Sequence, residues 1–184
     1  MRLSMKVTTA KVAKNLRDIQ TKDIPAAKHR AFTTGAKTGI SRASKQLAAN
    51  LNVPAWMIRG QKGKGSRFSK SRYDTKKDRG FITFRTRHIN PAGTKRKQRP
   101  IRVYKNGSVG VPGHKFDNAF GKNFRHFDSI YKKKAGGGLD IAKIEITQAH
   151  ISAVKRTLRR VIPREFAKKF EKELAYKLRK RGAR

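Results

Sequence analysis

Cysteine is absent from this sequence, and acidic residues are scarce. Of its 184 residues, 11 are Asp or Glu and 48 are Lys or Arg, which gives a net charge of +37. The absence of cysteine excludes a disulfide framework, a thiolate metal site and a cysteine nucleophile. A compact chain with this charge repels itself, so we expect a polyanion or an assembly of partners to compensate it. Nucleic acid is the usual polyanion.

Catalytic motifs and long apolar runs are also missing. Gly60–Ser66 has the spacing of a phosphate-binding loop but lacks the lysine that follows the last glycine of that motif. The histidines show no metal-ligand spacing, and the few carboxylates form no pair suited to acid–base catalysis. We therefore expect no enzyme activity, no cofactor and no metal. Because no stretch could span a bilayer, we expect a soluble protein without a membrane partner.

The hydrophobic pattern predicts an α+β fold in a single domain, because helical patterns at both ends flank consecutive strands. The expected helices cover residues 7–20, 23–51, 54–58 and 147–181. Asp23 is the expected cap of the long Ala-rich helix, and Trp56 is expected to anchor the short one in the core. Thr147 is the expected cap of the C-terminal helices, which Pro163 either kinks or restarts.

Between these helices, about residues 66–146 are expected to form antiparallel strands and hairpins of one sheet. The expected strands and hairpins cover residues 81–89, 101–111, 116–131 and 139–146. Asn106-Gly107 is a strong hairpin signal, and Gly121–Asn123 is the expected turn of the central hairpin. The helices at the two ends are expected to pack on this sheet.

The long N-terminal helix carries a stripe of small residues spaced four apart. Its centre is Ala31, Gly35, Gly39 and Ala43. Small residues let another backbone approach closely. Two partners remain open for this stripe: the sheet of the same chain, or a neighbouring subunit, in which case these four residues make the subunit contact.

The cations fall into two different blocks. Residues 59–105 contain 17 Lys or Arg and 2 Asp or Glu, in segments with little apolar content. We interpret 59–80 as a basic arm or extended hairpin and 94–99 as a basic loop that contact nucleic-acid phosphates without reading sequence. The candidate contact residues are Lys62, Lys64, Arg67, Lys70, Arg72, Lys76, Lys77, Arg79, Lys95, Arg96, Lys97 and Arg99. In residues 155–184 the cations alternate with an apolar stripe, which is typical of a solvated helix face.

The order of features resembles the minor tail protein Z family, the tail completion proteins of lambda-like long-tailed phages. The resemblance extends over nearly the whole chain and is carried by several segments. They are Ile24–Ala31, Val53–Arg59, Asn118–Phe120, Asp140–Ile144, Val161–Glu165 and Leu174–Arg181. Asn118 stands where the family has a glycine before the Ala-Phe pair.

The resemblance implies a structural virion protein at the head-proximal end of the tail, made in the host cytoplasm. Its implied partners are other neck and tail proteins, namely the tail terminator, the tape measure and the head–tail connector. It also implies a homo-oligomeric ring that borders the channel through which DNA passes. The basic arm and loop would then contact DNA or clamp neighbouring subunits.

Two other functional classes fit the charge. One is a free-standing, sequence-nonspecific RNA- or DNA-binding protein, for instance one associated with ribosomes. The other is a pure assembly protein whose cations meet acidic neighbours. A ring or virion location would exclude the first, and affinity for DNA at physiological salt would exclude the second.

Overall fold

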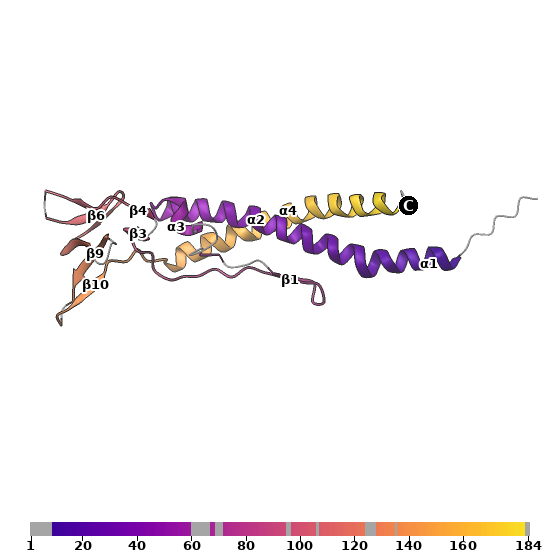
Figure 1. Ribbon diagram of the computed structural model, residues 1–184, viewed down its shortest axis with the longest axis horizontal. Coiled ribbons are helices and arrows are strands. Elements are labelled where there is room, and N and C mark those ends of the chain that lie inside the picture. The colour runs from indigo at the N-terminus through magenta and orange to yellow at the C-terminus, as the bar shows by residue number, and fades with distance from the viewer. Residues whose placement is uncertain are drawn as a thin grey trace, which may run out of the picture. The chain divides into compact units, whose positions relative to one another are not determined.

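The protein is described by a computed structural model over residues 9–59, 67–68, 72–94, 97–105, 107–123, 128–134 and 136–182. Its helical elements are α1 (Thr9–Asp18), the π-helical turn η1 (Ile19–Asp23), α2 (Ile24–Asn50), α3 (Ala55–Arg59) and α4 (Gln148–Gly182). Short antiparallel strands lie between α3 and α4 in the sequence (Figure 1). The predicted α+β class is therefore confirmed.

The described strands form small antiparallel sheets instead of one continuous sheet. The strands are β1 (Arg72–Asp74), β2 (Arg79–Phe81), β3 (Gly93–Thr94), β4 (Lys97–Gln98), β5 (Arg102–Val103), β6 (Val109–Val111), β7 (His114–Phe116), β8 (Ala119–Asn123), β9 (Asp128–Lys133) and β10 (Leu139–Ile141). The sheet orders are β1-β2, β3-β4, β5-β6-β7 and β10-β9-β8. Every pairing joins strands that are consecutive in sequence, as the predicted hairpin pattern requires.

The chain divides into two compact units, which are described separately. Unit 1 comprises Met1–Ile40, Lys70–Thr83 and Leu158–Arg184, and unit 2 comprises Ser41–Ser69 and Phe84–Thr157. Unit 1 therefore contains helical segments and the β1-β2 hairpin. Unit 2 contains the remaining sheets.

In unit 1, small residues let α2 lie directly against α4. A Cβ atom added at Gly39 would lie 2.8 Å from Ile162 Cγ1, and one added at Gly35 would lie 3.3 Å from the backbone nitrogen of Phe166. A side chain at Gly39 would force Ile162 to shift, whereas one at Gly35 would be a tight contact with the Phe166 backbone. The β1-β2 hairpin packs on α2 as well, with the Phe32 and Tyr73 ring centroids 5.4 Å apart.

Unit 2 has its own apolar core, drawn from α3 and the sheets. Ile58, Val111 and Ile130 have no exposed surface. His114 Nε2 lies 2.8 Å from the carbonyl oxygen of Leu51, which ties β7 to the residues that follow α2. The expected anchor Trp56 is only half-buried, because α3 turns Ile58 and its neighbour Met57 inward instead.

The central hairpin has a different register from the predicted one. β8 and β9 pair Ala119 with Lys132 and Asn123 with Asp128, so the predicted turn at 121–123 lies within a strand. Alternating apolar residues continue on both sides of this segment, so the pattern alone could not place the turn. Asn118 adopts φ 53, a left-handed conformation that asparagine tolerates, so it fits the position where a glycine was expected.

Other predicted elements need smaller corrections. The predicted strand over 81–89 is wrong: it has regular pairing only at Phe81, in β2, and isolated bridges at Phe84 and Ile89. α4 continues through Pro163 without a break. Asp23 does not cap a new helix, because η1 joins α1 to α2 and the Asp23 carboxylate binds other side chains.

Candidate nucleic-acid interface

The β1-β2 hairpin is the part of the predicted basic arm that the structure describes best. Its register pairs Arg72 with Phe81, Tyr73 with Gly80 and Asp74 with Arg79. At its turn, Asp74 Oδ1 accepts hydrogen bonds from the backbone N–H groups of Lys76 (3.0 Å) and Lys77 (3.3 Å). This side-chain-to-backbone bonding is a local signal for a turn and defines where the hairpin reverses.

The turn of the hairpin is fixed to α2 through one carboxylate. Asp78 accepts a hydrogen bond from the Tyr73 hydroxyl and pairs with Lys28 Nζ at 2.8 Å. Burial, together with the bond to Asp78, raises the pKa of Tyr73 to about 12. The hydrogen bond from Lys28, followed by that from Tyr73, holds the pKa of Asp78 below its usual value. Both hairpin carboxylates thus have structural partners.

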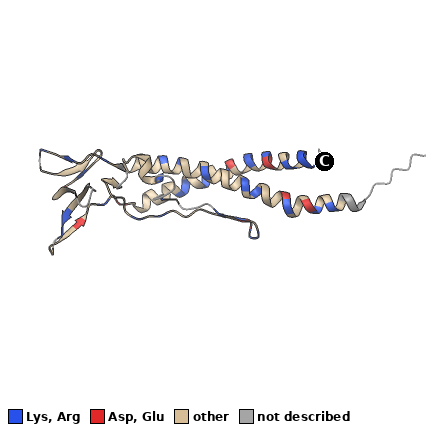
Figure 2. Ribbon diagram, viewed as in Figure 1, with Lys and Arg blue, Asp and Glu red and all other residues tan. Residues whose placement is uncertain are grey.

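Four predicted contact residues on this hairpin are exposed: Arg72, Lys76, Lys77 and Arg79. None of them makes an ion pair with another residue in the described ranges. A fixed turn therefore presents four uncompensated cations. Lys and Arg also greatly outnumber Asp and Glu along the helices (Figure 2).

Two other predicted contact residues serve the fold of unit 2. Arg67 donates hydrogen bonds to the carbonyl oxygens of Arg87 and His88, the latter at 2.7 Å. Arg99 is only 7% exposed and donates to the carbonyl oxygen of Pro112. Burial lowers the pKa of both guanidinium groups, with the charge of Arg87 adding to the effect at Arg67. Their partners are remote in sequence, so composition alone could not separate them from surface cations.

The other candidate contact residues are less fully placed. Lys62, Lys64, Lys70, Lys95 and Arg96 lie outside the described residues. Lys97 belongs to β4, which pairs with β3, so Thr94, Lys97 and Gln98 of the predicted 94–99 loop lie in paired strands. For all six, phosphate contact stays a prediction.

The stripe predicted to contact another subunit is buried within the chain. Ala31 and Ala43 have no exposed surface, and Gly35 and Gly39 face α4. The helix therefore packs on another helix of its own chain, which differs from both the sheet and the neighbouring subunit considered from the sequence. A subunit contact at this stripe stays a prediction.

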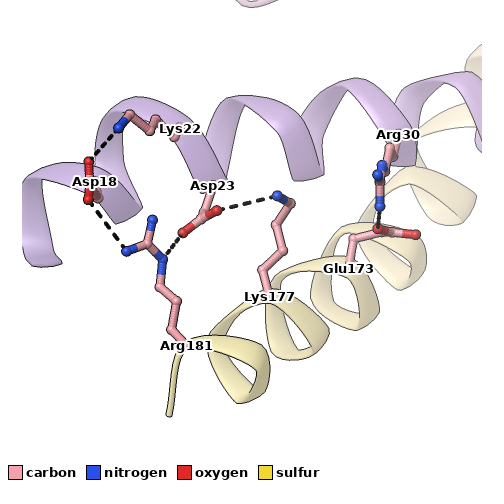
Figure 3. Close-up of polar contacts among 7 residues, drawn as sticks. All are labelled: Asp18, Lys22, Asp23, Arg30, Glu173, Lys177 and Arg181. Atoms are coloured by element: carbon pink, nitrogen blue, oxygen red, sulfur yellow. Dashed lines mark hydrogen bonds and ion pairs between the residues drawn. The ribbon is translucent and has the colours of Figure 1, made fainter. Parts of the chain in front are cut away.

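An ion-pair cluster that sequence reasoning missed joins the η1 region to the end of α4 (Figure 3). Asp23 pairs with Arg181 and, at 3.3 Å, with Lys177. Asp18 pairs with Lys22 at 3.0 Å and with Arg181 at 3.6 Å. The hydrogen bond from Lys22 is the main cause that lowers the pKa of Asp18. Burial acts to raise the pKa of Asp23, but the bonds from Arg181 and Lys177 outweigh it, so that pKa is also lowered.

The sequence of this chain matches a known protein family over nearly its whole length. The family model described as Prophage minor tail protein Z (GPZ) matches residues 8–184. The chain belongs to the prophage minor tail protein Z family. No curated protein and no solved structure matches it. The resemblance inferred from the sequence is therefore confirmed over nearly the whole chain, and membership assigns the protein a structural role in the phage tail.

The described part of this minor tail protein was compared with the requirements of a metal site and of a membrane-spanning helix. Across the described ranges, no three His, Asp or Glu side chains gather as metal ligands. A shallow hollow is lined by Asn118, Ala119, Phe120, Lys133 and Lys134, and this lining includes neither a carboxylate nor a histidine. Within the same ranges, no helix combines the length and the apolar content needed to cross a membrane.

Proposed function

We propose that this minor tail protein completes the head-proximal end of the tail and joins it to the head, as one subunit of a ring. In that position, the β1-β2 hairpin contacts the phosphates of DNA in the channel or clamps a neighbouring subunit. The observation that carries the proposal is a fixed hairpin with four exposed, uncompensated cations in a tail protein. We further propose that the protein has no enzymatic activity.

The geometry of the β1-β2 hairpin indicates that its four exposed cations serve to contact a partner and not to stabilise the fold. Asp74 organises the turn, and the Tyr73–Asp78–Lys28 contacts hold that turn against α2, so both carboxylates are bonded to groups other than the side chains of the four hairpin cations. Surface cations without partners contribute little to stability. Their contact with phosphates releases counterions, is independent of base sequence and weakens steeply with salt.

Neutralising the hairpin tests this proposal. A variant with Gln at Arg72, Lys76, Lys77 and Arg79, supplied in place of the wild-type protein during phage assembly, should still enter tails. The yield of infectious particles should fall by about tenfold or more, because four charge contacts with DNA or with a neighbour are lost.

The matched control places Gln at Arg85, Arg102, Lys105 and Lys133, which are exposed cations of unit 2. It loses the same net charge but keeps the hairpin, so it should give near-normal infectivity. Equal infectivity of the two variants would contradict a specific role for the hairpin.

A further inference from the structure

A regular ladder of cations follows the exposed face of α4 within unit 1. The ladder consists of Arg160, Arg164, Lys168 and Lys172, which are spaced four apart and all exposed. The half-buried apolar stripe of the same helix, Leu158, Ile162, Phe166 and Phe170, accompanies the buried Val161. Each cation follows a stripe residue by two positions, which is about 200° around an α-helix. The ladder therefore lies opposite the apolar stripe along its whole length.

Packing fixes the direction of this ladder. Ile162 and Leu158 lie against the position of Gly39 on α2, and the Phe166 and Phe170 rings stack with centroids 5.8 Å apart. The Phe166–Phe170 stack lies within α4, so it is the contacts of Leu158 and Ile162 with α2 that α4 would lose if it rotated its cations inward. The alternation in the sequence is thus a solvated helix face, on which Glu171 is the acidic residue among the exposed positions between the four cations.

The charge on the ladder is not compensated. None of its four residues forms an ion pair with any residue that the structure describes, and the nearby Glu173 pairs with Arg30 at 3.4 Å instead. Like charges four residues apart destabilise a helix. Repulsion among the four cations therefore lowers the stability of the helix. Binding of a partner outside the chain explains four positive charges at this spacing better than a contribution to stability does.

We propose that the ladder of α4 binds the phosphates of duplex DNA. It extends over about 18 Å at 1.5 Å per residue, a length over which a duplex presents roughly ten charges. The exposed residues between its members are Pro163, Ala167 and Glu171. None of these three is aromatic, and the exposed Tyr176 follows Lys172 by four positions, so an aromatic contact is available only beyond that end of the ladder. This inference rests on α4 alone and stands whether or not the β1-β2 hairpin contacts DNA.

The test is the salt dependence of DNA binding by the full chain. A variant with Gln at Arg160, Arg164, Lys168 and Lys172 keeps good helix formers, which circular dichroism can verify. Binding of a labelled DNA duplex of arbitrary sequence is followed by fluorescence anisotropy between about 50 and 200 mM salt. The slope of log K against log salt should become shallower by about 3 to 4, since each lost phosphate contact removes about 0.9.

Two further variants separate local contact from net charge. The unit 2 control variant described above loses the same charge and should change the slope by less than about 1. Arg160→Lys combined with Arg164→Lys keeps the cations and should keep the wild-type slope. The proposal is overturned if the ladder variant and the control have the same slope. It is also overturned if the ladder variant keeps duplex binding but loses binding to poly-glutamate, which would indicate an acidic protein partner.

Discussion

Replacing Gly39 with valine is expected to destabilise the protein by about 2 to 3 kcal/mol, because it forces side-chain atoms into a packed helix contact. The first added atom would lie 2.8 Å from Ile162 Cγ1 and 3.5 Å from Leu158 Cδ2. The gain in helix propensity over glycine offsets only about 0.5 kcal/mol of this cost. The free energy of unfolding in urea measures the net effect.

The control for this substitution is Lys37→Val, at an exposed position of the same helix. It should cost only about 0.5 kcal/mol, through helix propensity. Adding Ile162→Ala to Gly39→Val should restore part of the loss, because the shortened side chain makes room for the valine. If Gly39→Val were no more destabilising than Lys37→Val, α2 and α4 would not pack as the structure shows.

Replacing Asp23 with alanine is expected to cost about 2 to 3 kcal/mol. Asp23 is 8% exposed and its carboxylate is shared by Lys177 and Arg181, so its loss removes this partner from Lys177 and leaves Arg181 with only its longer pair to Asp18. Removing one member of a fully buried pair costs about 3 to 5 kcal/mol, and the partial exposure of Arg181 reduces that figure. Glu171→Ala, at an exposed position of α4, is the control and should change stability by less than about 0.5 kcal/mol.

The same carboxylate predicts how stability depends on pH. The folded-state pKa of Asp23 is lowered, so its contribution is present above the unfolded pKa and is lost as pH falls through the folded value. The stability difference between wild type and Asp23→Asn should therefore be constant near neutral pH and shrink below about pH 4. A difference that grew on acidification would contradict the ion pairing. Asp18 and Asp78 retain lowered pKa values in the variant, so some acid sensitivity should remain.

Local signals in the sequence predicted local structure well. The Asn106-Gly107 signal predicted a hairpin, and β5 pairs antiparallel with β6, with the Gly107 N–H donating to the Tyr104 carbonyl; Asn106 itself lies outside the described residues. Thr147 directly precedes α4, as predicted, but its hydroxyl lies 2.9 Å from His150 Nδ1. In residues 116–131 alternating apolar residues continue on both sides of the predicted turn, and the turn was misplaced. The end of α2 was predicted to within one residue. Asn52 adopts φ 47, a left-handed conformation that ends the helix.

The parts that could not be predicted depend on contacts between distant residues. Asp23 and Arg181 are 158 positions apart, and nothing near Asp23 distinguishes a paired carboxylate from a helix cap. Arg99 was grouped with the surface cations, although the fold buries it against Pro112. In both cases the sequence indicated that the side chain has a polar or charged partner, but only the tertiary structure shows which residue that partner is.

Family membership assigns the protein to the tail, and the proposal that it completes the head-proximal end is tested most directly by its position in the assembled particle. Intact virions can be labelled with an antibody against this protein and imaged by electron microscopy. The account predicts label at the junction between tail and head. Label at the distal tip of the tail, or along its whole length, would contradict it.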